Sequence, residues 1–557
     1  MPERIFIGVA WPYANGRLHL GHIAGACLPA DIFARYHRLK DNEVLMVSGS
    51  DQHGTPITVQ AEQEGLTPQQ VVDKYHASFL ECWQRLGIQF DLFTTTGTAN
   101  HRETVHDLFH RLEAGGYIHA GTMPLPYCTN EGRFLPDRYV EGTCPHCQSP
   151  RARGDQCERC GKTLDPQDLI DPRCRICGQR PVIRDSQHLF FRLSAFQEPL
   201  LAWVRRQDHW RPNVLNFTRR YLEEGLRDRS ITRDISWGVP TPVAGYEDKR
   251  IYVWFEAVMG YLSASKEWAQ RQGDPEGWRD FWQGEARSYY FMGKDNIAFH
   301  TIIWPAILMG AGGLNLPYDV PANEFLNLEG EKLSTSRNWA VWVPDYLERY
   351  APDPLRYYLS AGMPEGADAD FSWREYVRRN NDELVATYGN LVHRVMTFTY
   401  RNFEGRIPEP GPLDEQSQRL VARADAALQN VGNHLALCHF RLGIQEVMAL
   451  AQEGNRYVDA RAPWVTLRTD RQATATTLWT ALYAISALKT MVAPYLPFTT
   501  ERLHQMMGFP GTLQEAGWSV QRPQPGQPLE PPQPLFTKLE PTVVEEETSR
   551  LQAATRP

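Results

Sequence analysis

The sequence has no strong excess of charge of either sign and no long hydrophobic run. Its 58 Lys and Arg residues nearly balance 66 Asp and Glu residues, which leaves a net charge of −8 over 557 residues. That balance offers no global attraction to nucleic acid or to an anionic membrane, so such a partner would have to meet a local patch. The longest uncharged stretch, residues 296–318, contains His300, Asn315, two prolines and a Gly-Gly pair. It predicts a buried core segment, and the mean hydropathy of −0.46 argues against an integral membrane protein.

A secretory signal is also missing, because the apolar run at residues 5–10 is short and leads directly into Trp11-Pro12. Cysteine is scarce, and six of the 10 cysteines form three Cys-x-x-Cys pairs. In a long chain without a secretory signal, such pairs are typical of metal binding rather than of a disulfide framework. We therefore expect a large, cytoplasmic, zinc-binding protein of about three to four domains, with no membrane association.

The first fifty residues predict a βαβ unit. Residues 4–10 and 43–49 are continuous apolar runs typical of buried parallel strands, and a helical pattern covers about 19–40. A parallel sheet covered by helices follows, so the expected fold class is α/β with a Rossmann-type domain. Cysteine pairs, prolines and short polar turns then interrupt this pattern, which indicates an inserted, metal-pinned domain.

Further along, amphipathic helical stripes replace the α/β pattern, as at Leu384, Tyr388, Leu391 and Val395, and predict an all-α helix bundle. Prolines and then acidic residues dominate the end of the chain, most of which we expect to be extended or disordered, although Leu535-Phe536 could dock. The expected segments are a first Rossmann half at 1–115, a connective insertion with zinc knuckles at 116–232, a second Rossmann half at 233–323, a loop-rich segment at 324–375, the bundle at 376–521 and the tail at 522–557.

The first two cysteine pairs lie close together in the insertion. Cys144 and Cys147 are followed shortly by Cys157 and Cys160. Two pairs at this range suit one tetrahedral Zn²⁺, because each pair wraps two thiolates around the metal from a tight turn. The alternative, disulfides or free thiols, is disfavoured by the expected compartment.

The third pair, Cys174 and Cys177, lacks two ligands for a second zinc. Cys128 is one candidate, and Glu131 or His146 could supply another. One zinc is therefore predicted and a second stays open. A closed site of thiolates is structural, so we assign no catalytic water to it.

Two polar segments are candidates for a nucleotide site. His19 and His22 stand three residues apart at the start of the first helix, where free N–H groups favour phosphate and Gly21 permits close approach. Alone, the pair could equally be surface histidines or a metal pair. Far downstream, the polar loop at residues 330–337 carries Lys332, which can bring positive charge to a polyphosphate.

Together, these segments resemble the HIGH and KMSKS signatures of class I aminoacyl-tRNA synthetases, here HLGH at 19–22 and KLSTS at 332–336. Their order, their separation and the inserted knuckle domain also match. Further blocks resemble the methionine-specific family of that class, up to about residue 540. These blocks are residues 10–16, 49–56, 134–138, 185–188, 252–254, 293–295, 299–300, 304–305, 455–459 and 462–464.

The resemblance implies a two-step reaction. Methionine attacks the α-phosphate of ATP to give methionyl-adenylate, and the acyl group then passes to the 3′ end of tRNA(Met), the initiator tRNA included. No protein nucleophile is needed, because alignment and stabilisation of phosphate charge suffice, and Mg²⁺ accompanies ATP. His19, His22 and Lys332 are the implied catalytic residues. The implied ATP site comprises His19, Gly21, His22, Gly293, Asp295, Lys332, Ser334, Thr335 and Ser336.

Thr335 stands where the family often has a second lysine, and Arg337 or another lysine could compensate for it. In the implied methionine site, Asp51 holds the amino group, and Arg233 pairs with Asp51 or approaches the substrate carboxylate. An apolar slot with aromatic walls suits a thioether, although core packing is the ordinary role of each aromatic. The implied methionine-binding residues are Ala10, Trp11, Tyr13, Asp51, Arg233, Trp254, Ala257, Val258, Tyr261, His300, Ile303 and Trp304. Those that depart from the family pattern are Trp11, Val258 and Ile303.

Residues 324–375 are implied to contact the tRNA stem, and the bundle to read the CAU anticodon. An amide, a guanidinium and an indole can bind unstacked bases, although a solvated polar face and a core Trp are the alternative. The implied anticodon readers are Asn390, Arg394, Pro463 and Trp464. The basic track expected for the phosphates is Arg378, Arg379, Arg394 and Arg401.

Two rival functions stay open. Another class I synthetase would carry an editing domain, for which an insertion of about 120 residues filled with cysteine knuckles leaves no room. A non-catalytic tRNA-binding relative is disfavoured because His19, His22, Asp51 and Lys332 are all present. The dimerising domain of the family's longer members is missing, which favours a monomer.

Overall fold

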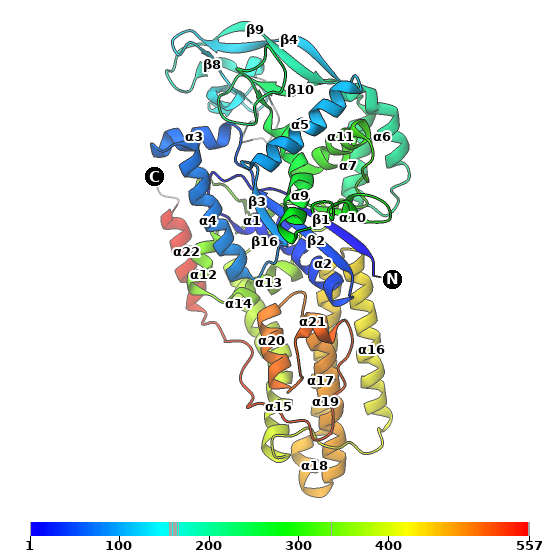
Figure 1. Ribbon diagram of the computed structural model, residues 1–557. Helices are drawn as coiled ribbons and strands as arrows, with labels where there is room; N and C mark the ends of the chain where they lie inside the picture. Colours follow the sequence, from blue (N-terminus) through cyan, green and yellow to red (C-terminus); the bar gives the residue numbers. More distant parts are fainter. Residues whose placement is uncertain are drawn as a thin grey trace.

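The computed structural model describes residues 2–554, apart from 155, 156, 158, 160–163, 165 and 336. Cys160 and Ser336 therefore lie outside the described residues. Figure 1 shows an elongated molecule, with an α/β body between a β-rich arm at the top and a helix bundle at the bottom. In the described part of the chain, no helix has the length and apolar character needed to cross a membrane.

Four parallel strands form the sheet of the body, in the order β13-β1-β2-β3, so the predicted parallel sheet is confirmed. Alternate residues of the central strand face opposite sides: Ile7 packs in the core that contains α2, and Phe6 in the core that contains α9. The strands are β1 (Arg4–Val9), β2 (Glu43–Ser50), β3 (Leu92–Thr95) and β13 (Arg287–Phe291). The helices of the body are α2 (Leu28–Leu39), α3 (Thr55–Glu64), α4 (Pro68–Leu86), α5 (Ala99–Ala114), α8 (Val253–Glu256), η5 (Ala257–Met259), α9 (Gly260–Gln272), α10 (Arg279–Trp282), η6 (Lys294–Asn296), η7 (Phe299–Ile303) and α11 (Trp304–Ala311).

The helix predicted after the first strand is present and begins at the carboxyl end of β1. It runs as α1 (Leu20–His22), a π-helical stretch η1 (Ile23–Cys27) and α2. The uncharged stretch at 296–318 is a core segment as predicted, because Ile302, Trp304 and Ile307 are buried in it.

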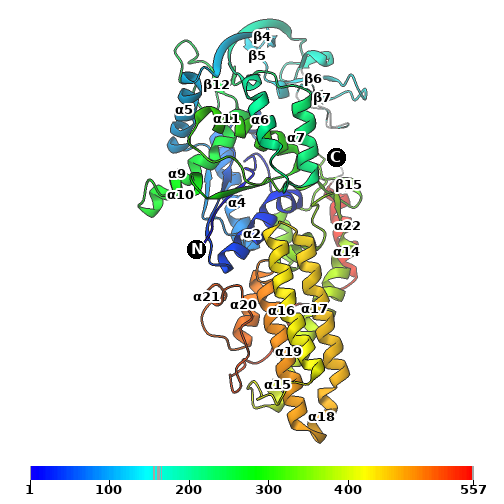
Figure 2. The ribbon, with the colours of Figure 1, turned by 90° about the vertical axis from the view of Figure 1, so that its right-hand side faces the viewer.

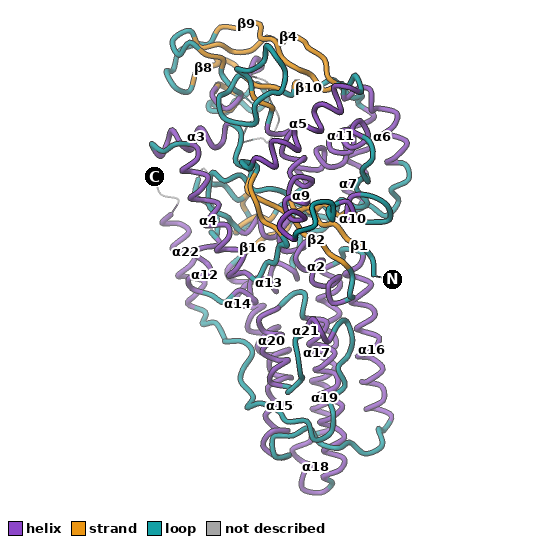
Figure 3. Tube along the Cα trace, viewed as in Figure 1, coloured by secondary structure: helices purple, strands orange, loops and turns teal. Residues whose placement is uncertain are grey.

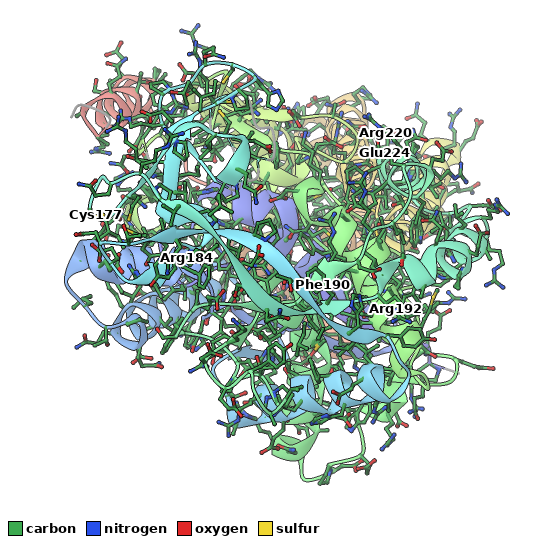
Figure 4. The ribbon with its side chains drawn as sticks, turned by 90° about the horizontal axis from the view of Figure 1, so that it is seen from above. Cys177, Arg184, Phe190, Arg192, Arg220 and Glu224 are labelled. Atoms are coloured by element: carbon green, nitrogen blue, oxygen red, sulfur yellow. The ribbon has the colours of Figure 1, made fainter. Side chains whose placement is uncertain are left out.

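The arm is built on a long antiparallel pair, β4 (Ile118–Cys128) and β9 (Val182–Phe191), which Figure 4 shows crossing the top of the molecule. Cys177 lies toward one end of this pair and Arg192 toward the other. The smaller elements of the arm and of the return to the body are β5 (Arg133–Phe134), η2 (Asp137–Tyr139), β6 (Val140–Thr143), β7 (Ala152–Arg153), η3 (Pro166–Asp168), β8 (Ile170–Cys174), η4 (Leu193–Phe196), α6 (Gln197–Val204), α7 (Pro212–Glu223), β10 (Arg229–Ser230), β11 (Thr232–Arg233) and β12 (Arg250–Ile251).

The lower half is almost entirely helical, as Figure 3 shows, and Leu384, Tyr388, Leu391 and Val395 are all buried, which confirms the predicted stripe. The bundle consists of η8 (Arg379–Gly389), α15 (Asn390–Asn402), α16 (Glu415–Ala436), α17 (Phe440–Arg461), α18 (Pro463–Thr469), α19 (Arg471–Val492), α20 (Pro497–Met506) and α21 (Leu513–Ala516). Between body and bundle lie β14 (Leu326–Leu328), β15 (Glu331–Lys332), α12 (Val343–Arg349), α13 (Pro352–Ala361), β16 (Ala369–Phe371) and α14 (Trp373–Arg378).

Arg356 of α13 joins the body to the bundle. Its buried guanidinium donates to the Asp31 carboxylate, to the Leu86 carbonyl and to the carbonyls of Pro494 and Tyr495. Because these acceptors belong to the body and to the segment before α20, one cation fixes both parts against each other.

The expectation of a mostly extended tail is confirmed for residues 522–541, which contain no helix or strand, and is wrong for the segment that follows. The chain returns to the body and ends in α22 (Thr542–Ala554), which lies beside α14 (Figure 2). Leu535 and Phe536 are buried, so their predicted docking is confirmed. The acidic run is ordered because Glu547 is buried against Arg349, whose Nε lies 2.8 Å from its carboxylate.

Candidate functional site

The two histidines after β1 are held in one tautomer by the backbone. The Gly21 N–H donates to His19 Nδ1 and the His19 N–H donates to His22 Nδ1, each at 3.1 Å. A ring nitrogen that accepts a hydrogen bond carries no proton, so both neutral rings carry theirs on Nε2. Burial lowers the pKa of His22 to about 4. The pKa of His19 is lowered well below its usual value by burial and, more weakly, by the neighbouring His22. At neutral pH the pair therefore offers two N–H donors and no positive charge.

The structure brings the two distant signature segments into contact. His19 bridges to Trp342, and the Leu20 N–H donates to the Val341 carbonyl at 3.2 Å. A Cβ on Gly21 would come within 3.0 Å of Leu333 Cδ1, so Leu333 packs directly over that glycine. Both segments consequently lie at the carboxyl end of β1, where parallel sheets bind ligands.

Within the downstream loop, Lys332 is exposed and Thr335 is also exposed. Arg337, which was expected to compensate for Thr335, reaches back to Glu331 at 3.3 Å and to the Lys332 carbonyl at 3.3 Å. In this conformation its charge is directed into the loop itself.

Asn338 joins this loop to two other parts of the molecule. Its φ of 52° is left-handed, a conformation that asparagine tolerates better than most residues. Its Nδ2 donates to the Ala554 carbonyl of α22, and its Oδ1 accepts from Trp342 Nε1. Since the Trp342 ring lies 6.1 Å from the His19 ring, the resting loop is braced by both α22 and the first motif.

Gly293 and Asp295 follow β13, the neighbour of β1 in the sheet. Gly293 bridges to Asn323, and a Cβ on Gly25 of η1 would lie 3.9 Å from the Gly293 Cα. Asp295, in η6, is exposed at the rim of the same sheet edge. Gly293 is thus placed next to η1, the helical stretch that directly follows the first motif.

Asp51 is buried, 3% exposed, directly after β2. Its backbone bridges to Tyr13, and its Oδ1 accepts the His53 N–H at 3.2 Å. Burial and then the nearby Glu256 carboxylate raise the pKa of Asp51 well above its usual value, while His53 and Thr96 oppose them. Such a carboxylate gains most from a cation that enters the site.

Aromatic side chains predicted for the slot are fixed by hydrogen bonds, and one of them, Tyr13, bridges to Asp51 through its backbone. Trp254 Nε1 donates to the Tyr13 hydroxyl at 3.0 Å, and the Tyr261 hydroxyl donates to His300 Nε2 at 2.8 Å. His300 Nδ1 donates to the Asn296 carbonyl, and burial lowers the pKa of His300 to about 4, so its ring is neutral.

Most of the remaining predicted slot residues share one apolar core with Tyr261. Trp304 is fully buried, and its Nε1 donates to the Tyr290 hydroxyl at 3.1 Å. The residues packed in or against the same core include Ala10, Trp11, Val258, Tyr261, Ile303 and Trp304, with Ala257 adjoining in η5. Apolar character is therefore retained where the chain departs from the family pattern.

Arg233 forms no ion pair with Asp51 among the described residues, so that expected pairing is wrong here. Its guanidinium lies 3.7 Å from the centre of the Tyr252 ring, and Nη1 donates to the Thr232 carbonyl at 2.8 Å. The Arg233 guanidinium is therefore held by a cation–π contact and by backbone carbonyls instead of by a carboxylate.

The six cysteines of the arm that the structure describes form two groups of three. In each, the Sγ atoms all lie within 4.8 Å of one another: Cys144, Cys147 and Cys157 in the first, Cys128, Cys174 and Cys177 in the second. Cys128 therefore joins the third pair, as the sequence allowed. Neither Glu131 nor His146 belongs to these groups.

The cysteine geometry fits a metal. Burial would raise the pKa of the Cys144 thiol, but the N–H groups of Cys147 and His146 and the neighbouring thiols lower it to about 7. Thiolates are the form that zinc binds, and N–H groups directed at sulfur are typical of knuckle turns.

In the bundle, Arg394, Pro463 and Trp464 meet at one cavity of about 270 Å³. The Trp464 ring is 45% exposed, and the Arg394 guanidinium lies 5.3 Å from its centre and 2.7 Å from Asp459. Asn390 is one turn earlier on the helix and does not line the cavity.

Sequence reasoning missed several residues that line this cavity, among them His393, Thr397 and Phe398. Their helical spacing around Arg394 and Arg401 was the available signal. Of the expected basic track, Arg394 and Arg401 line the cavity, whereas Arg378 and Arg379 do not and both pair with Glu375.

Comparisons with known proteins address the whole chain. Residues 5–396 match the family model "tRNA synthetases class I (M)", and residues 407–556 match "Anticodon binding domain of methionyl tRNA ligase". The chain is 56% identical to the methionine–tRNA ligase of Thermomicrobium roseum, over 100% of both chains. It is 58% identical to that of Dehalococcoides mccartyi, over 99% of this chain and 100% of the relative. Among solved structures, the Mycobacterium tuberculosis methionyl-tRNA synthetase in complex with methionyl-adenylate is similar, with a TM-score of 0.81 and 27% identity over 96% of this chain and 100% of that one.

Proposed function

The chain belongs to the methionine–tRNA ligases, a family of class I tRNA synthetases, and on that premise we propose how its own residues divide the reaction. The enzyme activates methionine with ATP and transfers it to tRNA. One observation supports the assignment of its residues: Leu333 of the downstream segment packs over Gly21 of the first motif at the carboxyl end of β1, and the buried carboxylate of Asp51 follows the adjacent strand β2.

In the adenylation step, the Nε2–H groups of His19 and His22 donate hydrogen bonds to the ATP phosphates. Lys332 supplies positive charge for the departing pyrophosphate. Because the histidines are neutral and held by the backbone, they need no reorganisation as charge develops. Gly21 acts at the ATP site by leaving space for the His19 ring and Leu333 and by orienting His19 through its N–H. Gly293 and Asp295 face the ribose side, and Ser334, Thr335 and Ser336 provide hydroxyl donors.

In the amino-acid site, Asp51 receives the methionine ammonium. The slot formed with Tyr13, Trp254, Tyr261 and His300 receives the thioether, because sulfur packs favourably against aromatic rings. A neutral His300 suits this role, since a charged ring would be costly beside an apolar side chain.

ATP use by class I synthetases implies Mg²⁺ on the phosphates. For zinc, the first site would be held by Cys144, Cys147, Cys157 and Cys160, and a second by Cys128, Cys174 and Cys177 with one further ligand. Bound zinc would cross-link the turns of the arm and take no part in the chemistry.

For tRNA(Met), the initiator included, Trp464 offers a stacking platform, and Arg394, Asn390 and Pro463 surround the CAU bases. The exposed ring and the adjacent cavity support this role. The enzyme would act as a monomer in the cytoplasm, where tRNA is charged.

The substitution Asp51→Asn tests the amino-acid site. It should raise the KM for methionine at least about tenfold in pyrophosphate exchange, and leave the KM for ATP within about twofold, because only the ammonium loses its partner. The matched control is Asp107→Asn on the exposed side of α5, which should behave as wild type. An unchanged KM for methionine in Asp51→Asn would remove Asp51 from the site.

A further inference from the structure

A fully buried glutamate lies behind the methionine site and belongs to none of the roles above. Glu256 is the last residue of α8, the helix that carries Trp254, and Ala257 and Val258 follow it directly. Its exposed fraction is 0%. The carboxylate receives two hydrogen bonds, from His53 Nδ1 at 2.6 Å and from His101 Nε2.

His53 and His101 come from different elements and extend the contact in two directions. His53 follows Asp51 by two residues, and its backbone N–H donates to the Asp51 carboxylate. His101 of α5 is fully buried, with its Nδ1 2.9 Å from the Ser263 Oγ of α9. A continuous array of hydrogen bonds thus connects α9, α5 and α8 to the loop that carries Asp51.

Two aromatic rings, Trp11 of the predicted slot and Trp237, also lie against this array. The Trp11 ring lies 6.5 Å from that of His101, and the Trp237 ring lies 6.1 Å from that of His53. Trp237 is itself tied to this loop, because its Nε1 donates to the Gln52 carbonyl at 2.6 Å. A displacement of Glu256 would therefore disturb both the slot wall and the loop.

The ionisation states of Glu256 and its histidine partners depend on one another. Burial would raise the pKa of Glu256, but His53 and His101 lower it to about 2, so the carboxylate is ionised. Burial would lower the pKa of His53, but Glu256 and, more weakly, Asp51 raise it. The groups that face one another are Asp51 after β2, His53, His101 from α5 and Glu256 from α8. Removing one member leaves another charge buried without its partner.

We infer that Glu256 is a positioning residue for methionine recognition: through His53 it holds the loop of Asp51, and through α8 it holds the wall of the thioether slot. The spacing between the ammonium site and the slot is then set by one carboxylate. This inference rests on the proposed role of Asp51. It predicts an effect on methionine and none on ATP, because among the described residues the hydrogen bonds of the array do not extend to residues 19–22 or 332–335.

The first test is Glu256→Gln, which keeps the shape and removes the charge. In pyrophosphate exchange at pH 7.5 it should raise the KM for methionine about tenfold, with the KM for ATP within about twofold. Glu256→Asp, which restores the charge on a shorter side chain, should recover part of the loss. The matched control is Glu267→Gln on α9, because Glu267 accepts from Thr94 and Arg271 and is outside the array.

A pH profile provides a readout that a merely structural role would not move. As the pH rises through the raised pKa of His53, the ring loses its proton and the charged tie to Glu256 weakens, so the wild-type KM for methionine should rise. In Glu256→Gln the pKa of His53 falls, so this rise should begin at lower pH. The titration of methionine itself affects both proteins equally.

His53→Asn covers the case that Glu256→Gln does not fold, since the amide keeps a donor without the charge, and it should abolish the pH-dependent rise. A KM for methionine within twofold of wild type in Glu256→Gln, or equal increases for methionine and ATP, would overturn the inference. If Asp51→Asn raises the KM and Glu256→Gln does not, only the positioning role fails. If Asp51→Asn has no effect, the ammonium site itself is misplaced.

Discussion

The body and the bundle present their recognition residues in opposite ways. In the body, His22, Asp51 and His300 are surrounded by protein, and burial moves the pKa of each away from its usual value. In the bundle, the candidate reader Trp464 is 45% exposed beside an open cavity. Charge that develops on a phosphate is best stabilised by prearranged dipoles in a site with little water, whereas an unstacked base needs an accessible ring.

The bundle has its own buried ionisable group, away from that surface. Lys489 of α19 is fully buried, with its ammonium directed at Gln521 and 3.1 Å from His504 Nδ1. The two regions therefore use their buried ionisable groups differently. In the body these groups face a ligand site, and in the bundle Lys489 faces the packed loop that ends the bundle.

The largest expected effect is that of His22→Ala on adenylation. Loss of one prearranged Nε2–H donor should lower kcat/KM in pyrophosphate exchange about 10²- to 10³-fold, with little change in the KM for methionine. His110→Ala, an exposed histidine on α5, serves as the control. Exchange at the wild-type rate would break the comparison, because the buried pair would then have no catalytic role.

Trp464→Ala should have the next largest effect, and only on tRNA. Loss of one stacking platform should lower kcat/KM for tRNA charging about 10- to 100-fold while pyrophosphate exchange stays near the wild-type rate. Val465→Ala is the matched control, since Val465 is also exposed and next in sequence. Equal losses in charging and exchange would contradict a role confined to RNA.

Lys489→Met should leave both activities unchanged and alter only the pH dependence of stability. Burial lowers the pKa of Lys489 to about 7, so the folded chain releases a proton that the unfolded chain keeps up to its ordinary, higher pKa. The wild-type free energy of unfolding should therefore rise between pH 7 and 10, by up to about 4 kcal/mol, and the rise should flatten in Lys489→Met. Denaturant unfolding at several pH values measures this, and parallel curves would refute it.

Local patterns predicted much of the fold and part of the site. The buried run at 4–10, the helix that follows it and the stripe from Leu384 to Val395 all have the predicted structure, since hydrophobic periodicity is a property of neighbouring residues. The cysteine pairs were visible in the same way. The last helix, α22, was missed because acidic residues after a proline-rich stretch are typical of disorder when no partner is known.

Other features had no local signal. Glu256, His53 and His101 are far apart in the chain, and no spacing rule connects them. The contact of Leu333 with Gly21 and the bond of Asn338 to α22 likewise depend on how distant segments meet. The same holds for Arg233, which the tertiary structure stacks on Tyr252 instead of pairing it with Asp51.

Chain-local chemistry was thus enough to identify the βαβ unit, the two signature segments, the knuckle cysteines and the helical bundle, because periodicity, turn residues and ligand spacing act over a few positions. Folding in three dimensions settled which thiol joins Cys174 and Cys177, which charges are buried together behind Asp51, and where the last helix docks. Those outcomes depend on desolvation and on contacts between remote segments, and neither can be computed from neighbours in the sequence.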